Sequence, residues 1–102
     1  FEAVRRTISS IGKTKLHVTK SQIAFRRRQA LAWVWMPGTY LRGDVAPLVL
    51  TVSLRHRDPS PRWKEIVEPA PGRFTHHLEL YTVDEIDDEV RGWLLAAWRL
   101  AA

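Results

Sequence analysis

The sequence predicts a two-layer α+β domain, with an antiparallel meander sheet of four to five strands and an amphipathic helix at each end. Apolar residues recur at helical spacing in residues 1–11 and 86–100. Between these stretches, short segments alternate apolar and polar residues and are separated by Pro, Gly and Asp. Because a helix repeats about every 3.6 residues and a strand every two, the predicted order is helix, strands, helix. That order is typical of a sheet backed by helices.

The first helix is predicted over residues 1–11. Its apolar side chains are spaced three or four residues apart and therefore share one face of a helix. Gly12 follows this stretch, and glycine commonly ends a helix because it adopts a left-handed turn. The apolar face consists of Phe1, Val4, Ile8 and Ile11.

Five segments are predicted as strands: residues 16–26, 30–36, 48–55, 63–68 and 74–81. We expect an interruption of the first near Lys20. The second is apolar on both faces, which is typical of a central strand. The third alternates most cleanly, and the fourth is a short edge strand ended by proline. Residues 26–29 form a polar hairpin connection between the first two.

The last helix is predicted from residue 82 to residue 100. Thr82 and Glu85 have the spacing of a capping box, in which both side chains bind free amides at a helix start. The acidic residues that follow are favoured there by the helix dipole. Its buried stripe is expected to contain Ile86, Val90, Trp93, Leu94, Ala97 and Leu100.

Length and composition limit the class of protein. A chain of 102 residues is close to the size of one domain, so we predict a single domain over residues 1–102. Its first residue is Phe1, which leaves open whether it is part of a longer chain. The absence of cysteine excludes disulfides, zinc–thiolate sites and a cysteine nucleophile, and it favours a cytoplasmic location. No apolar run approaches the ~20 residues that cross a bilayer, so we expect no membrane partner.

The charge is unevenly distributed along the chain. Residues 1–64 contain thirteen Lys or Arg against three acids, whereas residues 65–102 contain three Arg against eight acids. A basic half attracts phosphates through salt-sensitive electrostatics, so we predict a surface that binds nucleic acid or another acidic partner. The alternative is a solvated face whose charge the acidic helix partly offsets. The residues predicted to bind a polyanion are Lys20, Arg26, Arg27, Arg28, Arg55 and Arg57.

The aromatic residues suggest a second function. The chain has five tryptophans, and Trp33 and Trp35 project from the same face of one predicted strand. With Tyr40 and His76 they could line a small-ligand pocket between the sheet and the helices. The alternative is that the tryptophans only pack the core, and that His76, on the face of Phe74 and Leu78, is a hydrogen-bonded core histidine.

Little in the sequence indicates an enzyme. His76 and His77 face opposite sides of a strand and cannot bind one metal together, while His77 and Glu79 share a face and could form an acid–base pair. No phosphate-binding glycine loop and no GxSxG motif is present. We therefore predict no catalytic residue, no metal site and no cofactor. Self-association, with the acidic helix of one copy against the basic half of another, is a further expectation.

Three segments resemble a bacterial family of domains of unknown function. Residues 19–27 and 74–80 are similar to its T-K-x-x-I-A-F and H-H-x-x-L patterns, and residues 84–94 to its acidic closing helix. Some members are labelled predicted transport protein, and the resemblance implies no established activity. It implies a small α+β layout and singles out Lys20 and His76. If the first and last strands are neighbours, Lys20 would lower the pKa of His76 and create an anion-attracting corner.

Overall fold

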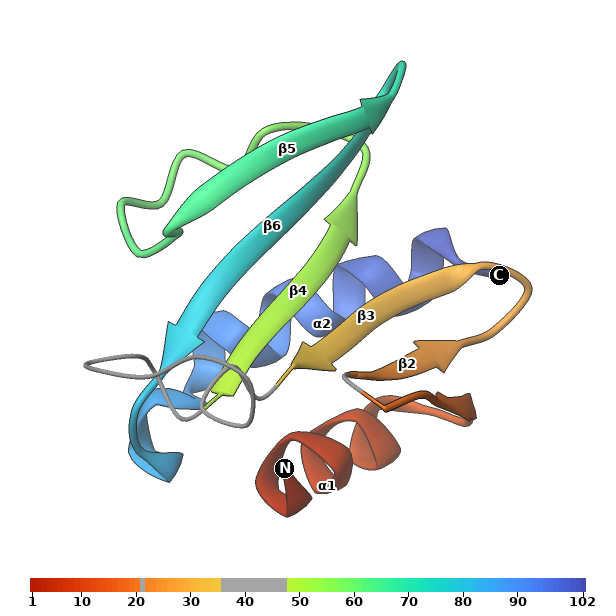
Figure 1. Cartoon of the computed structure of the whole chain (residues 1–102), viewed down its shortest axis with the longest axis vertical. Coiled ribbons are helices and arrows are strands. Elements are labelled where there is room, and N and C mark those ends of the chain that lie inside the picture. The colour runs from red at the N-terminus through yellow and green to blue at the C-terminus, as the bar shows by residue number, and fades with distance from the viewer. Residues whose placement is uncertain (21, 36–47) are drawn as a thin grey trace.

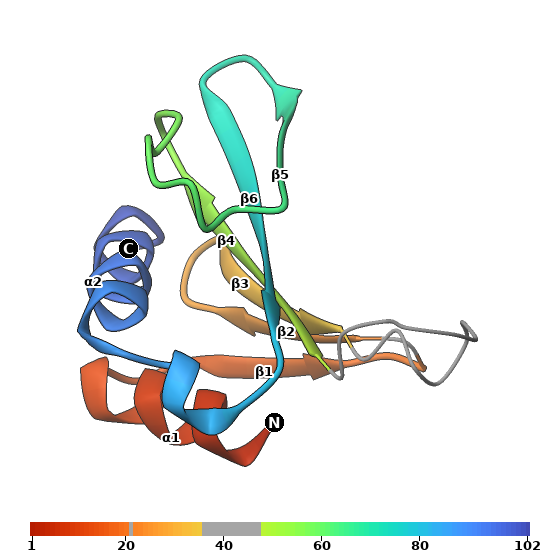
Figure 2. The same cartoon turned by 90° about the vertical axis from the view of Figure 1, so that its left-hand side faces the viewer.

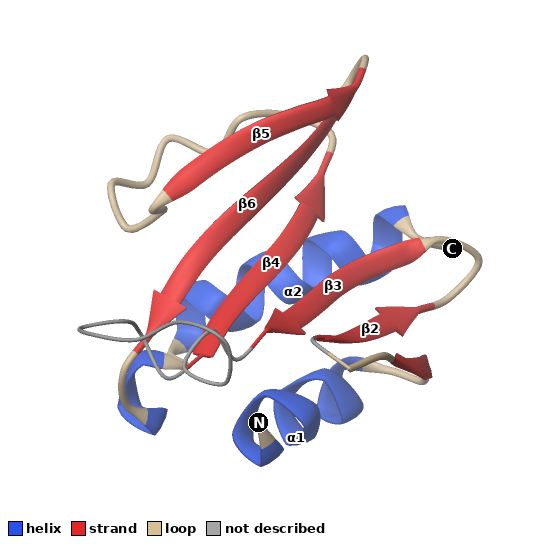
Figure 3. Cartoon of the chain, viewed as in Figure 1, coloured by secondary structure: helices blue, strands red, loops and turns tan. Residues whose placement is uncertain are grey.

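The computed structural model describes residues 1–20, 22–35 and 48–102, which form one antiparallel sheet with two α-helices (Figures 1 and 3). The elements of the described residues, in chain order, are α1 (Glu2–Ile11), β1 (Lys15–Val18), β2 (Gln22–Arg26), β3 (Ala30–Trp35), β4 (Leu48–Leu54), β5 (Glu65–Ala70), β6 (Arg73–Leu80), the 3₁₀ turn η2 (Val83–Glu85) and α2 (Asp88–Leu100). The predicted α+β class and the helix at each end are confirmed.

The sheet contains six strands among the described residues, more than the four to five predicted. The predicted first strand is in fact the hairpin of β1 and β2. Thr19 makes the turn between them, because its N–H and its hydroxyl both donate to the carbonyl of Gln22, at 2.9 and 3.1 Å. The N–H of Gln22 donates in return to the Thr19 hydroxyl.

The strand order, β1-β2-β3-β4-β6-β5, departs from a simple meander at its end. The chain passes from β4 to the outer edge, forms β5, and returns as β6 between β4 and β5 (Figure 1). Pro69 and two glutamates explain why β5 is an edge strand, since proline cannot donate to a sheet ladder and charges discourage further pairing. Gly72 turns the β5–β6 hairpin with a φ of 73°, a conformation that glycine adopts without strain.

The hydrophobic core lies between one face of the sheet and the two helices. In both views α2 lies alongside β3 and β4, and α1 lies beside β1 and β2 (Figures 1 and 2). The fully buried core residues of β3, β4, β6 and the helices include Val4, Ile8, Val34, Leu50, Val52, Val90 and Leu94. No helix in residues 1–20, 22–35 and 48–102 is long and apolar enough to cross a membrane.

The end of the chain differs from the prediction in where the last helix begins. The capping box of Thr82 and Glu85 is present, but it caps the turn η2. The helix α2 begins at Asp88 and has its own cap, because the side chain of Asp87 accepts a hydrogen bond from the N–H of Val90. A carboxylate at a helix N-terminus also interacts favourably with the helix dipole.

Candidate nucleic-acid interface

A cluster of basic residues lies at the end of the sheet where β2 ends and β3 begins, next to the C-terminal end of α2 (Figure 1). Residues 27–29 connect the two strands, one residue fewer than the predicted 26–29, because Arg26 is the last residue of β2. The N–H groups of Arg28 and Gln29 both donate to the carbonyl oxygen of Ala101, at 2.9 and 3.2 Å. These bonds satisfy a carbonyl that the end of a helix leaves unpaired. They also hold the connection against α2.

The side chain of Arg27 lies over the ring of Trp98, which comes from the last turn of α2. Its guanidinium carbon is 3.7 Å from the ring centroid, and its Nη1 donates to the backbone carbonyl of Trp98 at 3.0 Å. A guanidinium is attracted to the electron-rich face of an indole. The stack and the hydrogen bond together fix the position of the Arg27 side chain.

Trp98 is itself fixed by the segment that follows α1. Its Nε1 donates to the carbonyl of Lys13 at 3.1 Å. A Cβ atom on Gly12 would overlap the indole ring, so the close approach of helix and loop requires glycine there. Three distant segments, 12–15, 26–29 and 98–101, therefore meet at Trp98.

These segments enclose an open groove with a volume of about 580 Å³. Among the described residues six line it, of which four are cationic and none is acidic: Lys13, Thr14, Lys15, Arg26, Arg27 and Trp98. Lys15 and Arg26 are exposed partners across β1 and β2, so their side chains lie on the same face of the sheet. Within the described part of the chain neither forms a salt bridge. Like charges at directly opposed positions repel, and a bound anion would relieve that repulsion.

Further arginines lie beside the groove. Arg55, after β4, and Arg73, at the start of β6, both donate to the side-chain oxygen of Gln29, at 3.5 and 3.0 Å. Arg28 is exposed next to Gln29. We refer to Lys13, Lys15, Arg26, Arg27, Arg28, Arg55 and Arg73 as the basic edge. Sequence reasoning missed Arg73, because only the position of β6 beside β4 brings it near Gln29.

Two other residues predicted to bind a polyanion lie elsewhere. The guanidinium of Arg57 is 5.3 Å from the ring centroid of Phe74, and Arg57 does not line the groove. Lys20 belongs to the turn between β1 and β2, at the opposite end of β2 from Arg26. Its predicted proximity to His76 is wrong, because β3 and β4 lie between β2 and β6. At about 4.8 Å per strand, β2 and β6 are roughly 14 Å apart.

His76 is a buried core residue, with no exposed surface. Its Nδ1–H donates to the carbonyl of Phe74 at 3.1 Å, and its Nε2 accepts from the N–H of Asp58 at 3.0 Å, which assigns the tautomer. Burial lowers the pKa of His76 below its ordinary value of 6.5, because desolvation disfavours the charged ring. The hydrogen-bonded core histidine is therefore the interpretation that the structure confirms.

The predicted pocket of Trp33, Trp35, Tyr40 and His76 does not form between the sheet and the helices. The strand register puts Trp33 on the face of Thr51 and His77, whereas His76 pairs with Val52 on the helix-covered face. The sheet itself therefore separates Trp33 and Trp35 from His76. Tyr40 lies outside the described residues.

The face of the sheet opposite the helices carries a separate groove of about 500 Å³. It is lined by Gln22, Trp35, Val49, Thr51, Lys64, Glu65 and His77. The Nδ1 of His77 lies 2.8 Å from the hydroxyl of Thr51, and the ammonium of Lys64 lies 3.3 Å from the carboxylate of Glu79. His77 and Glu79 thus have different partners. In residues 1–20, 22–35 and 48–102, no group of three His, Asp or Glu side chains could hold a metal.

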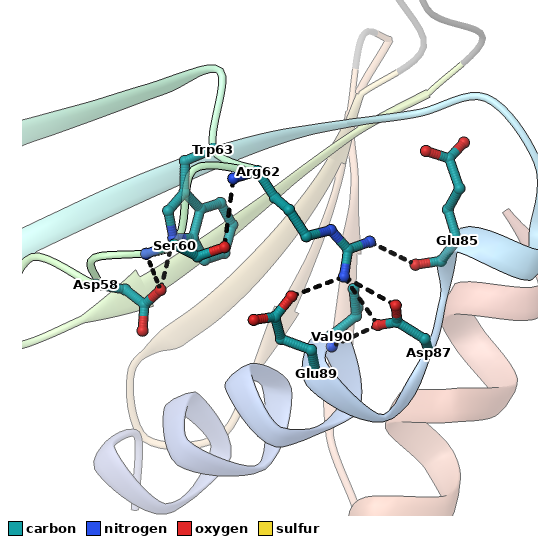
Figure 4. Close-up of polar contacts among 8 residues, drawn as sticks. All are labelled: Asp58, Ser60, Arg62, Trp63, Glu85, Asp87, Glu89 and Val90. Carbon is teal, nitrogen blue, oxygen red and sulfur yellow. Dashed lines mark hydrogen bonds and ion pairs between the residues drawn. The ribbon is translucent and has the colours of Figure 1, made fainter.

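One basic residue of the N-terminal half is neutralised by the acidic start of α2 (Figure 4). The Nη1 of Arg62 bonds to the carboxylates of Asp87 and Glu89, each at 2.9 Å, and its Nη2 donates to the carbonyl of Glu85. Hydrogen bonds to Glu89 and Asp87 raise the pKa of Arg62, and those from the N–H of Val90 and from Arg62 lower the pKa of Asp87. The charge-offset alternative therefore holds for Arg62, and the basic edge lies away from this cluster.

Comparisons with known proteins support a family of domains of unknown function, as the sequence suggested. No match to this chain was found among curated proteins, and none was found among solved structures. A match was found to one protein family, and it extends over residues 1–101, almost the whole chain. The chain therefore belongs to the family described as Domain of unknown function (DUF5655).

Proposed function

We propose that this protein binds nucleic acid through the basic edge. The observation that carries the proposal is the groove formed by Lys13, Lys15, Arg26 and Arg27, whose lining among the described residues contains four cations and no acid. Phosphate contacts supply most of the affinity of nonspecific nucleic-acid binding, and Lys and Arg supply most phosphate contacts. Repulsion between Lys15 and Arg26, for which the described part of the chain provides no salt-bridge partner, favours the uptake of a polyanion at this place.

The expected binding is driven by charge and shape. In α2, the helix end that meets the basic edge is its C-terminus, held by the 27–29 connection. A recognition helix of the helix-turn-helix class instead contacts bases with its N-terminal residues, and the N-terminal residues of α2 are acidic. Nonspecific complexes of this kind have dissociation constants of roughly 10⁻⁴ to 10⁻⁶ M at physiological salt. The protein is therefore expected to bind many sequences with similar affinity.

The test is fluorescence anisotropy of labelled DNA and RNA, titrated with the protein across a salt series. The double variant Lys15→Gln/Arg26→Gln removes two cations of the groove and is expected to weaken binding strongly. The matched control, Arg6→Gln/Lys20→Gln, removes the same charge from exposed positions that do not line the groove, and binding is expected to persist. The proposal would be contradicted if the two double variants lost equal affinity, or if the unmodified protein did not bind at low salt. Stronger binding to heparin than to nucleic acid would point to another polyanion.

A second candidate function is the binding of a small organic ligand, supported by the groove on the open face of the sheet. Trp35 and Val49 provide apolar surface there, and Thr51, His77 and Gln22 provide polar groups. Its volume lies within the roughly 300–1,000 Å³ typical of ligand sites. A thermal-shift screen tests this function. A ligand of this groove should lose its shift in Trp35→Leu and keep it in Trp33→Leu, because Trp33 does not line the groove.

A further inference from the structure

We infer that the groove of the basic edge takes an unpaired base, and that the nucleic acid bound there is single-stranded. The inference rests on the proposed function and adds the class of nucleic acid. The carrying observation is that Arg27 and Trp98, stacked at 3.7 Å, both line the same groove as three further cations. A nucleotide binds well where a planar side chain lies among cations. Its base stacks on the planar side chain, and its phosphate pairs with the cations.

The residues of the groove offer two kinds of surface, one apolar and one positively charged. The groove contains the indole of Trp98. Lys and Arg side chains commonly lay their aliphatic stems along apolar surface and keep their charged ends in water. We therefore expect the stems of Lys13, Lys15 and Arg26 to add to the apolar walls of the groove. A base is flat and apolar on its faces, and a phosphate is charged and hydrated. The walls therefore suit the base, and the ammonium and guanidinium groups suit the phosphates on either side of it. The volume of about 580 Å³ is sufficient for a nucleoside.

The planar groups are held in place before any ligand binds. Arg27 is fixed by its bond to the carbonyl of Trp98, and Trp98 by its bond to the carbonyl of Lys13. The loop that carries Arg27 is fixed by two bonds to Ala101. Side chains that are ordered in advance lose little conformational entropy on binding, so stacking adds directly to affinity.

A duplex fits this site less well. Its bases are paired and stacked, and they offer only their edges in the grooves. The connection 27–29 is bonded to the end of α2, and the side chain of Arg27 turns back onto Trp98. The connection 27–29 therefore does not project as a hairpin tip that could enter a groove of the duplex. A duplex would meet only the outer cations, whereas a single strand can also place a base beside Arg27 and Trp98.

The first experiment compares three probes with the unmodified protein: a labelled oligothymidylate, an abasic strand of the same length, and a duplex of the same length. The abasic strand keeps the phosphates and lacks the bases. We expect the oligothymidylate to bind about 5- to 150-fold more tightly than the abasic strand, the range that stacking of one base supplies. Equal binding of the two strands, or tighter binding of the duplex, would overturn the inference.

The second experiment uses two variants of equal charge. Arg27→Lys keeps the cation and removes the planar guanidinium, and Arg6→Lys makes the same change at an exposed residue of α1 outside the basic edge, with no ring contact among the described residues. We expect Arg27→Lys to weaken oligothymidylate binding at least several-fold and to leave abasic-strand binding unchanged. Arg6→Lys should leave the binding of both strands unchanged. Equal loss for both strands in Arg27→Lys would overturn the inference. If Arg27→Lys fails to fold, judged by circular dichroism, the first experiment decides by itself.

The results also separate this inference from the function on which it rests. Tight, salt-sensitive binding of the abasic strand and the duplex, with no gain from bases, would retain nucleic-acid binding and remove the stacking site. If neither strand, nor the duplex, nor heparin binds at low salt, both the stacking site and the proposed nucleic-acid binding are ruled out.

Discussion

The N–H of Asp58 donates to the Nε2 of His76 across 3.0 Å, and this bond joins the loop after β4 to the middle of β6. The carboxylate of Asp58 in turn accepts from the Nε1 of Trp63, 3.0 Å away, and from the N–H of Ser60. The ring of Trp63 lies 4.8 Å from that of His76 and 4.0 Å from that of Trp93 on α2. One buried, neutral histidine thus organises the contact between loop, sheet and helix.

The first prediction concerns the pH dependence of stability. Because the pKa of folded His76 is lowered below 6.5, the unfolded chain binds its proton more tightly than the folded chain does. The free energy of unfolding is therefore expected to be highest above pH 6.5 and to fall as the pH drops below it. Protonation would also remove the acceptor for the N–H of Asp58. Denaturant titrations at several pH values measure this dependence of the free energy of unfolding on pH.

The control for this prediction is His17, which is exposed on β1. His17→Gln should keep the decline below pH 6.5, whereas His76→Gln should be less stable at neutral pH and show a weaker decline there. Protonation of Asp58 adds a further decline of the free energy of unfolding at lower pH. Burial opposes ionisation of its carboxyl, but the bonds from Trp63 and Ser60 prevail and lower its pKa below 3.8. A His76→Gln protein with the full decline below pH 6.5 would contradict the assignment.

The second prediction concerns Gly12. Gly12→Ala is expected to cost about 1–3 kcal/mol of stability, because its Cβ would overlap the ring of Trp98. Displacement of Trp98 should also weaken nucleic-acid binding. Gly92, within α2, is the matched control, since a Cβ there meets no atom within 4 Å. Gly92→Ala should be neutral or stabilise by up to about 1 kcal/mol. Thermal unfolding of both variants measures the difference, and equal effects would contradict the close contact at Gly12.

The third prediction concerns Arg62. Arg62→Gln is expected to destabilise the protein by about 1–2 kcal/mol, because it removes bonds to Asp87, Glu89 and Glu85 that tie the loop before β5 to the start of α2. Arg5→Gln removes an exposed pair with Glu2 within α1 and should have little effect. Denaturant titration at low and high salt compares them. If the two variants lose equal stability, the Arg62 cluster is no more than a surface ion pair.

The fourth prediction concerns salt. Each cation that contacts a phosphate adds roughly 0.7 to the slope of log K against log salt for a single strand, and about 0.9 for B-DNA. Lys15→Gln/Arg26→Gln should therefore reduce the single-strand slope by about 1.4. The control Arg6→Gln/Lys20→Gln should leave the slope unchanged. Weaker binding without a change in slope would mean that Lys15 and Arg26 do not contact phosphates.

Local patterns were sufficient to predict much of the fold. The alternation in β4 predicted its core face, and Leu48, Leu50, Val52 and Leu54 are all buried. The stripe of the last helix was predicted in the same way, and Val90, Trp93, Leu94 and Ala97 are buried, whereas Ile86 is half-buried before α2 begins and Leu100 is exposed. Side-chain spacing identifies the face that an element turns to the core. It did not indicate that β4 buries Val49 and Thr51 on its other face as well. The interruption near Lys20 was expected and is present. That it is a turn, which makes a hairpin of β1 and β2, was missed, because the turn depends on the hydrogen bonds between Thr19 and Gln22.

The candidate site depended on tertiary structure to a greater degree. The sequence indicated a basic half and the arginines at residues 26–28. It did not indicate that Trp98 lies under Arg27, since the two are 71 residues apart and meet only because the 27–29 connection bonds to Ala101. The separation of Trp33 from His76 likewise followed from the register of β3, β4 and β6, which involves residues far apart in the chain.

By itself, the sequence determined the α+β class, most of the elements, their buried faces and the excess of positive charge, because all of these follow from local spacing and composition. The strand order, the face to which each aromatic residue belongs, and the groove that joins Lys13, Arg26, Arg27 and Trp98 were decided only by the tertiary structure. The physical reason is that strand pairing and the contact of a helix end with a loop are nonlocal. Their energies depend on which surfaces become buried together, and local residue patterns do not specify that choice.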